Sequence, residues 1–248
     1  MQDTNFIHIH SWRPLAAITQ HPFFTLNKET VINTWIALGI LVIAVAITRY
    51  ALSRRSGILR YLLVSFARSF IDLTQQTLGV FHAGHFYFAT SLFMFLLVCN
   101  CITVLPWTEE PTQDLNTTLA MGISSFVYIQ AYAIRAHGFL GYLKEYVTPL
   151  FIMFPLHVIS KLSSIISLSF RLFGNIFGGA VISRIYLSAI QGSWLFETLG
   201  LLSGINFIIV FFFIMFEGAL QAFVFAMLSL TYLSIAIAGE EPPMGDLP

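Results

Sequence analysis

An arginine stands within a long apolar stretch of this sequence. Arg171 lies near the middle of residues 155–190, in the run Ser-Leu-Ser-Phe-Arg-Leu-Phe-Gly-Asn that spans residues 167–175. Arginine keeps its proton in proteins, so a bilayer location would cost roughly 2.5 to 17 kcal/mol unless a partner or a water-filled cavity offsets the cost. On a helix, four small residues fall on or beside the arginine's face: Ser164, Ser167, Gly174 and Gly178. They would leave a trough that another helix can enter, so this charge is a candidate functional group.

Further polar residues share the segment of Arg171. They recur at roughly helical spacing and approximate one stripe: His157, Lys161, Ser164 and Asn175. His157 is a candidate member of an ion pathway, although a surface position near the start of the helix would also explain it. The general alternative is that such groups only hold helices together, each interhelical hydrogen bond being worth about 0.6 kcal/mol.

A second polar stripe lies in residues 205–238. Glu217 and Gln221 are four residues apart and share a helix face, with Asn206 three turns below on the same side. Glu217 follows a run of phenylalanine, isoleucine and methionine, which makes it a carboxylate fit for a proton relay. An antiparallel hairpin of the two long segments would set their stripes side by side.

The composition is that of a membrane protein. Of the 248 residues, 57% are hydrophobic and 10% are charged, whereas about 25% are charged in an ordinary soluble domain. The formal net charge is zero and the basic residues are scattered, so no nucleic-acid partner is expected. Cys99 and Cys101 lie in one apolar segment on opposite sides of a helix, so we expect neither a disulfide nor a metal site, and no cofactor.

Apolar runs predict an all-α polytopic membrane protein with a single membrane domain at residues 31–238. The five expected spans are residues 31–50, 86–105, 115–134, 155–190 and 205–238. Residues 57–81 are too polar to cross and predict an amphipathic helix on the membrane surface. Residues 155–190 would make a helix of about 54 Å at 1.5 Å per residue, against a hydrocarbon core of roughly 30 Å. We therefore expect the last two helices to form a steeply tilted hairpin, although breaks at their glycines would also resolve the excess.

The distribution of charge predicts an orientation. Arginines follow the first span at positions 49, 54, 55 and 60, which places that end in the cytoplasm and residues 1–30 outside. The loop at residues 107–116 holds acidic residues and no Lys or Arg, so it should face outside. Residues 239–248 are acidic and Pro-rich, and we expect a disordered tail on the cytoplasmic side. The absence of a transit sequence favours a bacterial inner membrane, with an organellar inner membrane as the alternative.

Three stretches resemble subunit a of the F-type ATP synthase, the stator subunit beside the membrane rotor. The first is Ser-Leu-Ser-Phe-Arg-Leu-Phe-Gly-Asn-Ile-Phe-Gly-Gly at residues 167–179. The second is Leu-Gln-Ala-Phe-Val-Phe-Ala-Met-Leu at residues 220–228, followed by Tyr232. The third is Glu-Pro-Thr-Gln-Asp-Leu-Asn at residues 110–116, similar to the family's external loop. Their order and their spread over about residues 30–238 make the match specific.

The resemblance implies roles for particular residues. Arg171 matches the arginine that acts on the ion-binding carboxylate of each passing rotor subunit and blocks leakage between two aqueous half-channels. Gln221 matches the glutamine that faces this arginine from the last helix, and Asn175 matches the asparagine one turn after the arginine. Asp114 and Asn116 match residues near the mouth of the external half-channel.

Two positions depart from the family pattern. Many members carry Glu nine residues after the arginine, where this chain has Ala180, and His or Glu seven residues before the glutamine, where it has Ile214. Both usual relay positions therefore lack a titratable group. Glu217, one turn before Gln221, is our candidate for the displaced carboxylate.

The sequence thus predicts a proton-translocating stator subunit without a catalytic centre, since no phosphate-binding Gly-rich loop of the G-x-x-x-x-G-K-[ST] kind is present. The expected partners are a rotor ring of small carboxylate-bearing subunits, peripheral stalk subunits and the lipid bilayer. One alternative is a secondary transporter in which Arg171 binds an anionic substrate, which would predict internal repeats. Another is a haem-binding respiratory subunit, with His82, His85 and His157 as possible axial ligands.

Overall fold

The computed structural model describes residues 11–12, 26–54, 57–102, 108, 110–147, 154–190, 212 and 216–238. The elements in these ranges are β1 (Ser11–Trp12), β2 (Leu26–Asn27), α1 (Lys28–Ser53), α2 (Ile58–Leu78), α3 (Ala83–Cys101), the 3-10 helix η3 (Pro111–Gln113), α4 (Leu115–Val147), α5 (Phe154–Ile190) and α8 (Gly218–Ala238). Five of the described helices, α1, α3, α4, α5 and α8, are long and apolar enough to cross a membrane. The predicted helical, multi-pass membrane fold is confirmed.

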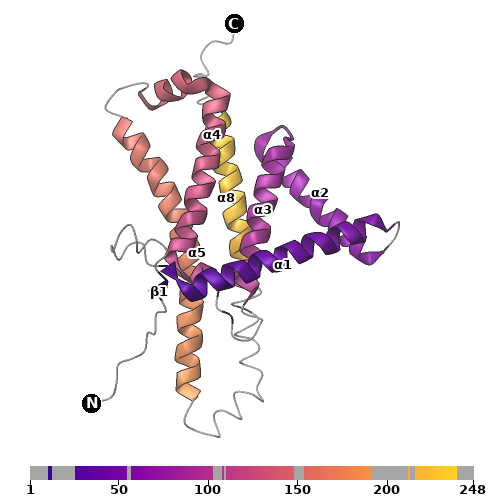
Figure 1. Ribbon diagram of the computed structural model, residues 1–248. Coiled ribbons are helices and arrows are strands. Elements are labelled where there is room, and N and C mark those ends of the chain that lie inside the picture. The colour runs from indigo at the N-terminus through magenta and orange to yellow at the C-terminus, as the bar shows by residue number, and fades with distance from the viewer. Residues whose placement is uncertain are drawn as a thin grey trace, which may run out of the picture.

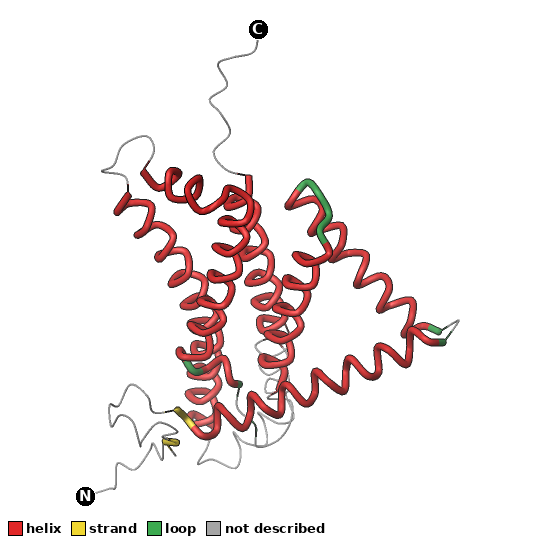
Figure 2. The backbone as a smooth tube through the Cα atoms, turned by 45° about the horizontal axis from the view of Figure 1, so that its top comes forward, coloured by secondary structure: helices red, strands yellow, loops and turns green. Residues whose placement is uncertain are grey.

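The described helices fall into two parts. Helices α3, α4, α5 and α8 form a bundle, and α1 and α2 extend from its side in a V (Figures 1 and 2). Much of α1 presents apolar side chains outward, among them Trp35, Val42 and Ile43, which are 71%, 66% and 61% exposed. Lipid is the solvent in which such a surface is stable. The described part of the N-terminal segment adds a two-residue antiparallel pair, in which Ser11 pairs with Asn27 and Trp12 with Leu26.

Helix α2 has the amphipathic character that the sequence predicts for residues 57–81. It ends at Leu78 because Gly79 adopts a left-handed conformation (φ 73°) and donates its N–H to the Gln75 carbonyl. Phe70 and Thr74 are the buried residues of this helix. The Ser234 hydroxyl of α8 donates to the Thr77 carbonyl over 2.8 Å, which ties α2 to the bundle.

The core lies where α3, α5 and α8 meet, with Phe70 of α2 at its edge. Its buried members are Phe70, Leu92, Phe93, Leu96, Leu168, Leu172, Ile176, Ala222, Phe225 and Ala226. Close approach of α4 and α5 depends on a glycine, because a Cβ on Gly122 would collide with the Ser169 hydroxyl. Small residues at such contacts allow membrane helices to pack by van der Waals attraction.

Helix α4 extends past the predicted span of residues 115–134. It continues to Val147 but bends at Gly138, whose φ of 71° few residues other than glycine adopt. Beyond the bend, the helix turns across the end of the bundle (Figure 1). Phe139, Leu140 and Leu143 on this part are exposed, as expected for a helix lying in a membrane interface.

Helix α5 is one continuous helix of 37 residues, close to the predicted bounds of 155–190. It passes Gly174, Gly178 and Gly179 without a break and crosses α4 obliquely (Figure 1). Helix α8 covers the second half of the predicted segment 205–238, and most of residues 205–215 lie outside the described part. The predicted tail at residues 239–248 and most of residues 1–30 also lie outside it, and the tilt of α5 against a membrane stays a prediction.

Candidate functional site

The two polar stripes meet between α5 and α8. The Asn175 side-chain amide donates to the Gln221 side-chain oxygen over 2.8 Å. Gln221 is only 2% exposed, so this bond satisfies a buried polar group. It forms because Leu172 and Ile176 of α5 pack against small residues of α8, Ala222 and Ala226, which lets the helices approach closely.

Arg171 points away from this contact. Its side chain is exposed, whereas its neighbours Leu168 and Leu172 are buried against the bundle. Within the part of the chain that the structure describes, Arg171 makes no hydrogen bond or ion pair with another side chain. The structure therefore pairs Gln221 with Asn175 rather than with Arg171.

Small residues leave the space beside Arg171 open. Ser167 and Gly174 are exposed, and a Cβ added to Gly174 or Gly178 would meet nothing within 4 Å. The predicted trough therefore exists on the outer face of α5. It presents one permanent positive charge on a surface that a membrane helix of another chain can approach.

Glu217 lies directly before the first residue of α8. Phe216 and Glu217 form part of a π-helical turn that leads into the regular helix at Gly218, and such turns are frequent at functional sites. The Glu217 side chain is half-buried and has no hydrogen bond or ion pair with any described residue. A carboxylate in this position is available to exchange a proton with a group or water outside the described part.

A buried polar chain fixes the helix start next to Glu217. The Asn100 amide of α3 donates to the Gly218 carbonyl over 2.9 Å, and the Thr112 hydroxyl of η3 donates to the Asn100 side-chain oxygen over 2.9 Å. Asn100 is 1% exposed and Thr112 is 0% exposed. A Cβ on Gly218 would lie 3.0 Å from the Asn100 Cβ, which is tighter than an ordinary contact, so a side chain there would press against Asn100. The sequence analysis did not identify Asn100, although an asparagine in an apolar span was the available signal.

Replacement of Asn100 by leucine is expected to lower the free energy of unfolding by about 2–4 kcal/mol. Leucine keeps the size but leaves the Thr112 hydroxyl and the Gly218 carbonyl without partners, each at a cost of about 1–3 kcal/mol when buried. Thermal unfolding of the purified chain would measure the loss. Thr90→Val is the matched control, because the Thr90 hydroxyl is buried without a partner in the structure; an equal loss in both variants would contradict the assigned bonds.

The loop before α4 holds Asp114 and Asn116. Asp114 is the N-cap of α4, since its carboxylate accepts the Asn116 backbone N–H over 3.0 Å. Its second carboxylate oxygen lies 3.5 Å from the Thr30 hydroxyl. Helix capping alone accounts for an aspartate here, while the exposed Asn116 side chain is free to meet water. Thr112 joins this loop to the chain that ends beside Glu217.

The predicted residue His157 lies at the other end of the bundle. It is the fourth residue of α5 and half-buried, and α5 runs antiparallel to α8, so it is remote from Glu217 along the helix. The structure therefore brings Asn175 and Gln221 into contact and places Arg171 on the outer face of the same helix. It joins neither Glu217 nor His157 to that pair by a described bond.

Comparison with known proteins gives the family. The family model described as "ATP synthase A chain" matches residues 31–234, which is most of this chain. The chain belongs to this family. A relative from Picosynechococcus named "ATP synthase subunit a 2" is 33% identical over 229 residues, covering 90% of this chain and 91% of the relative. "ATP synthase subunit a" of Moorella thermoacetica is 31% identical over 212 residues, covering 86% and 92%.

Membership of the ATP synthase A chain family replaces the two alternative interpretations. The haem interpretation relied on His82 and His85, which are neighbours at the start of α3 rather than a pair across two helices. His85 is buried, with its Nδ1 atom 3.1 Å from the Tyr128 hydroxyl. The transporter interpretation relied on Arg171, which lies within residues 31–234 that the family model matches.

Ala180 and Ile214 occupy the two positions at which many members of the family carry a titratable relay residue. Ala180 is half-buried on α5, one and a half turns beyond Asn175, and it offers no group that can carry a proton. Ile214 lies outside the described residues. Glu217 is thus the nearest described carboxylate to Gln221 along α8.

Proposed function

We propose that this chain is the proton-translocating stator subunit of an F-type ATP synthase, with Arg171 acting on a carboxylate of each passing rotor subunit. The observation that carries the proposal is an exposed arginine in an apolar helix face, beside a trough and without a partner among the described residues. A counter-ion from another chain completes such a site.

The electrostatics of Arg171 suit this role. Two opposite charges 4 Å apart attract by about 4 kcal/mol at an effective dielectric constant of 20. The arginine therefore favours the ionised form of a ring carboxylate that comes opposite it. It also repels a proton, so protons do not pass directly between the two half-channels.

The other site residues fit a path on either side of Arg171. We assign Asp114 and Asn116 to the mouth of the external half-channel, and Glu217 to the relay between that mouth and the ring. The bond between Asn175 and Gln221 holds α5 against α8, which keeps Arg171 at a fixed position toward the ring. His157 lies on the side where protons leave or enter the cytoplasmic half-channel.

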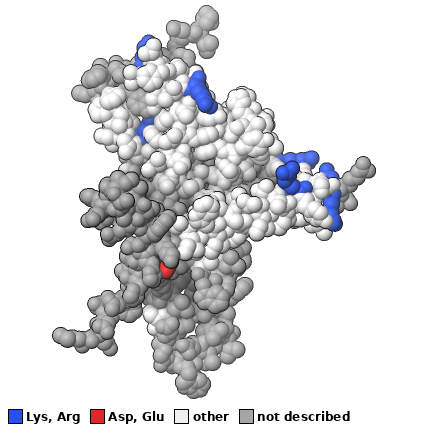
Figure 3. All heavy atoms as spheres, in the orientation of Figure 1, with Lys and Arg blue, Asp and Glu red and all other residues white. Residues whose placement is uncertain are grey.

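The chain acts within a larger assembly. ATP chemistry belongs to other subunits, and the peripheral stalk anchors this chain against the turning ring. We assign it to a bacterial inner membrane, with the N-terminus outside and the C-terminus in the cytoplasm. Lys and Arg gather at the junction of α1 and α2 and at the end of the bundle where α4 bends (Figure 3), in keeping with this orientation.

Purification of the tagged full-length chain from its own membrane tests the proposal. A mild detergent extract should yield, with this chain, a ring of small subunits that each bear one carboxylate in a membrane helix. A chain isolated without such a ring but with saturable binding of a small anion would instead support a transporter.

A further inference from the structure

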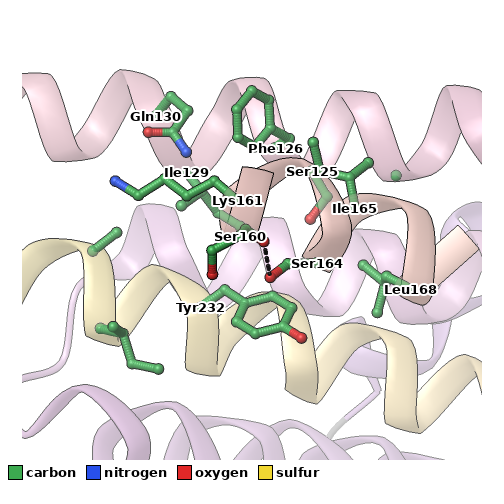
Figure 4. Close-up of a pocket in the computed structure, with 13 residues that line it drawn as sticks. Ser125, Phe126, Ile129, Gln130, Ser160, Lys161, Ser164, Ile165, Leu168 and Tyr232 are labelled. Atoms are coloured by element: carbon green, nitrogen blue, oxygen red, sulfur yellow. Dashed lines mark hydrogen bonds between the residues drawn. The ribbon is translucent and has the colours of Figure 1, made fainter. Parts of the chain in front are cut away.

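A cavity lies between α4, α5 and α8. Its volume is about 280 Å³. Most of its wall is apolar, with Ile129 from α4, Ile165 and Leu168 from α5 and Ile235 from α8. Figure 4 shows Lys161 and Gln130 at one end of this cavity and Leu168 at the other. One end of the cavity is therefore polar and the other end is apolar.

The polar end lies beside the part of α4 that follows the bend at Gly138. Beyond the bend at Gly138, α4 carries exposed Phe139 and Leu140 and lies across the end of the bundle. Tyr142 on this part donates its hydroxyl to the Gln130 side-chain oxygen over 2.5 Å. The Lys161 ammonium is 5.1 Å from the centroid of the Tyr142 ring. Lys161 is thus held next to the part of α4 that carries exposed apolar side chains, and its neighbour is a tyrosine, a residue enriched at membrane interfaces.

The charge of the lining has one sign. Lys161 is the charged residue among those that line the cavity. Basic pockets between membrane helices bind the headgroups of anionic lipids. The apolar walls beneath Lys161 offer an acyl chain a surface to cover, which a free phosphate ion would leave bare.

We propose that this cavity binds one anionic phospholipid, with its phosphate on Lys161 and the upper part of one acyl chain between α4, α5 and α8. The Gln130 amide and the Ser160 hydroxyl are further donors at the same end. Such a lipid would fill the gap between α4 and α5. The proposal is independent of the role assigned to Arg171.

Native mass spectrometry of the purified complex tests the site, with phosphatidylglycerol and phosphatidylcholine of identical acyl chains supplied in excess. Wild-type chain should retain one phosphatidylglycerol at about tenfold higher occupancy than phosphatidylcholine. Lys161→Gln should lower that occupancy about tenfold. Lys144→Gln is the matched control, since it removes a cation of α4 that does not line the cavity, and it should change occupancy by less than about twofold.

A second variant tests the apolar part. Ser164→Leu keeps Lys161 but adds carbon atoms inside the cavity, and it should also lower the occupancy about tenfold while its unfolding temperature stays near that of wild type. Equal loss in Lys161→Gln and Lys144→Gln, or full retention in both Lys161→Gln and Ser164→Leu, would overturn the proposal. Displacement of the lipid by excess inorganic phosphate would show an anion site without lipid specificity. Binding that appears only when residues 239–248 are deleted would assign the cavity to that acidic tail, and would also overturn the proposal.

Discussion

Arg171→Ala is expected to lower ATP synthesis by the assembled complex to about 1% of wild type or less. Loss of a fixed charge that acts on the reacting group typically costs a factor on the order of 10² to 10³. Without the arginine, no positive charge favours the ionised form of a ring carboxylate at the boundary between the half-channels, so the carboxylate would keep its proton there. The side chain is exposed and has no partner among the described residues, so its removal should leave folding and assembly intact. ATP synthesis driven by an imposed proton gradient in inverted vesicles measures the effect.

The matched control for this variant is Arg68→Ala. Arg68 is also an exposed arginine, but it lies on α2, and substitutions of exposed residues usually change stability by less than about 0.5 kcal/mol. Synthesis should stay near the wild-type rate. Normal synthesis by Arg171→Ala in fully assembled complexes would refute the assignment of Arg171.

Glu217→Gln is expected to slow proton flux through the membrane sector about tenfold or more. The amide keeps the size and hydrogen-bonding capacity of the carboxyl but cannot take up and release a proton, and a positioned proton-transfer group commonly contributes a factor of about 10² or more. Passive flux through vesicles stripped of the catalytic part is the measurement. Glu217→Asp should retain part of the flux, because it keeps an ionisable group one methylene shorter.

Asp72→Asn is the matched control for Glu217→Gln, because it also replaces one acidic side chain by its amide. Asp72 is exposed on α2, and its replacement should leave the passive flux unchanged. If Glu217→Gln also conducts at the wild-type rate, Glu217 does not belong to the pathway and the relay must use another group.

The sequence predicts the helices well because each is long and apolar. α5 begins at Phe154 and ends at Ile190, within one residue of the predicted bounds, since its apolar run has no proline between position 156 and its end. The pairing of the two polar stripes also follows from periodicity alone, and the bond between Asn175 and Gln221 bears out their contact.

Other features depend on contacts between segments that are distant in the sequence. The chain from Thr112 through Asn100 to Gly218 joins residues that are 12 and 118 positions apart, and no local pattern reveals such spacing. The bend at Gly138 lies beyond the predicted span of residues 115–134, because that span was drawn from the apolar run alone and α4 continues past it to Val147. The resemblance implies that Gln221 faces Arg171. In the structure the Arg171 side chain is exposed, and Asn175 donates to Gln221 instead.

The central claim is that the trough beside Arg171 faces the ring carboxylate, and a cysteine cross-link measures this most directly. The background carries Cys99→Ala and Cys101→Ala, one cysteine on the ring subunit a turn from its carboxylate, and either Gly174→Cys or the exposed control Ile123→Cys on α4. Oxidation of assembled complexes should join the ring subunit to this chain through position 174 and not through position 123. A cross-link through position 123, with none through position 174, would contradict the account.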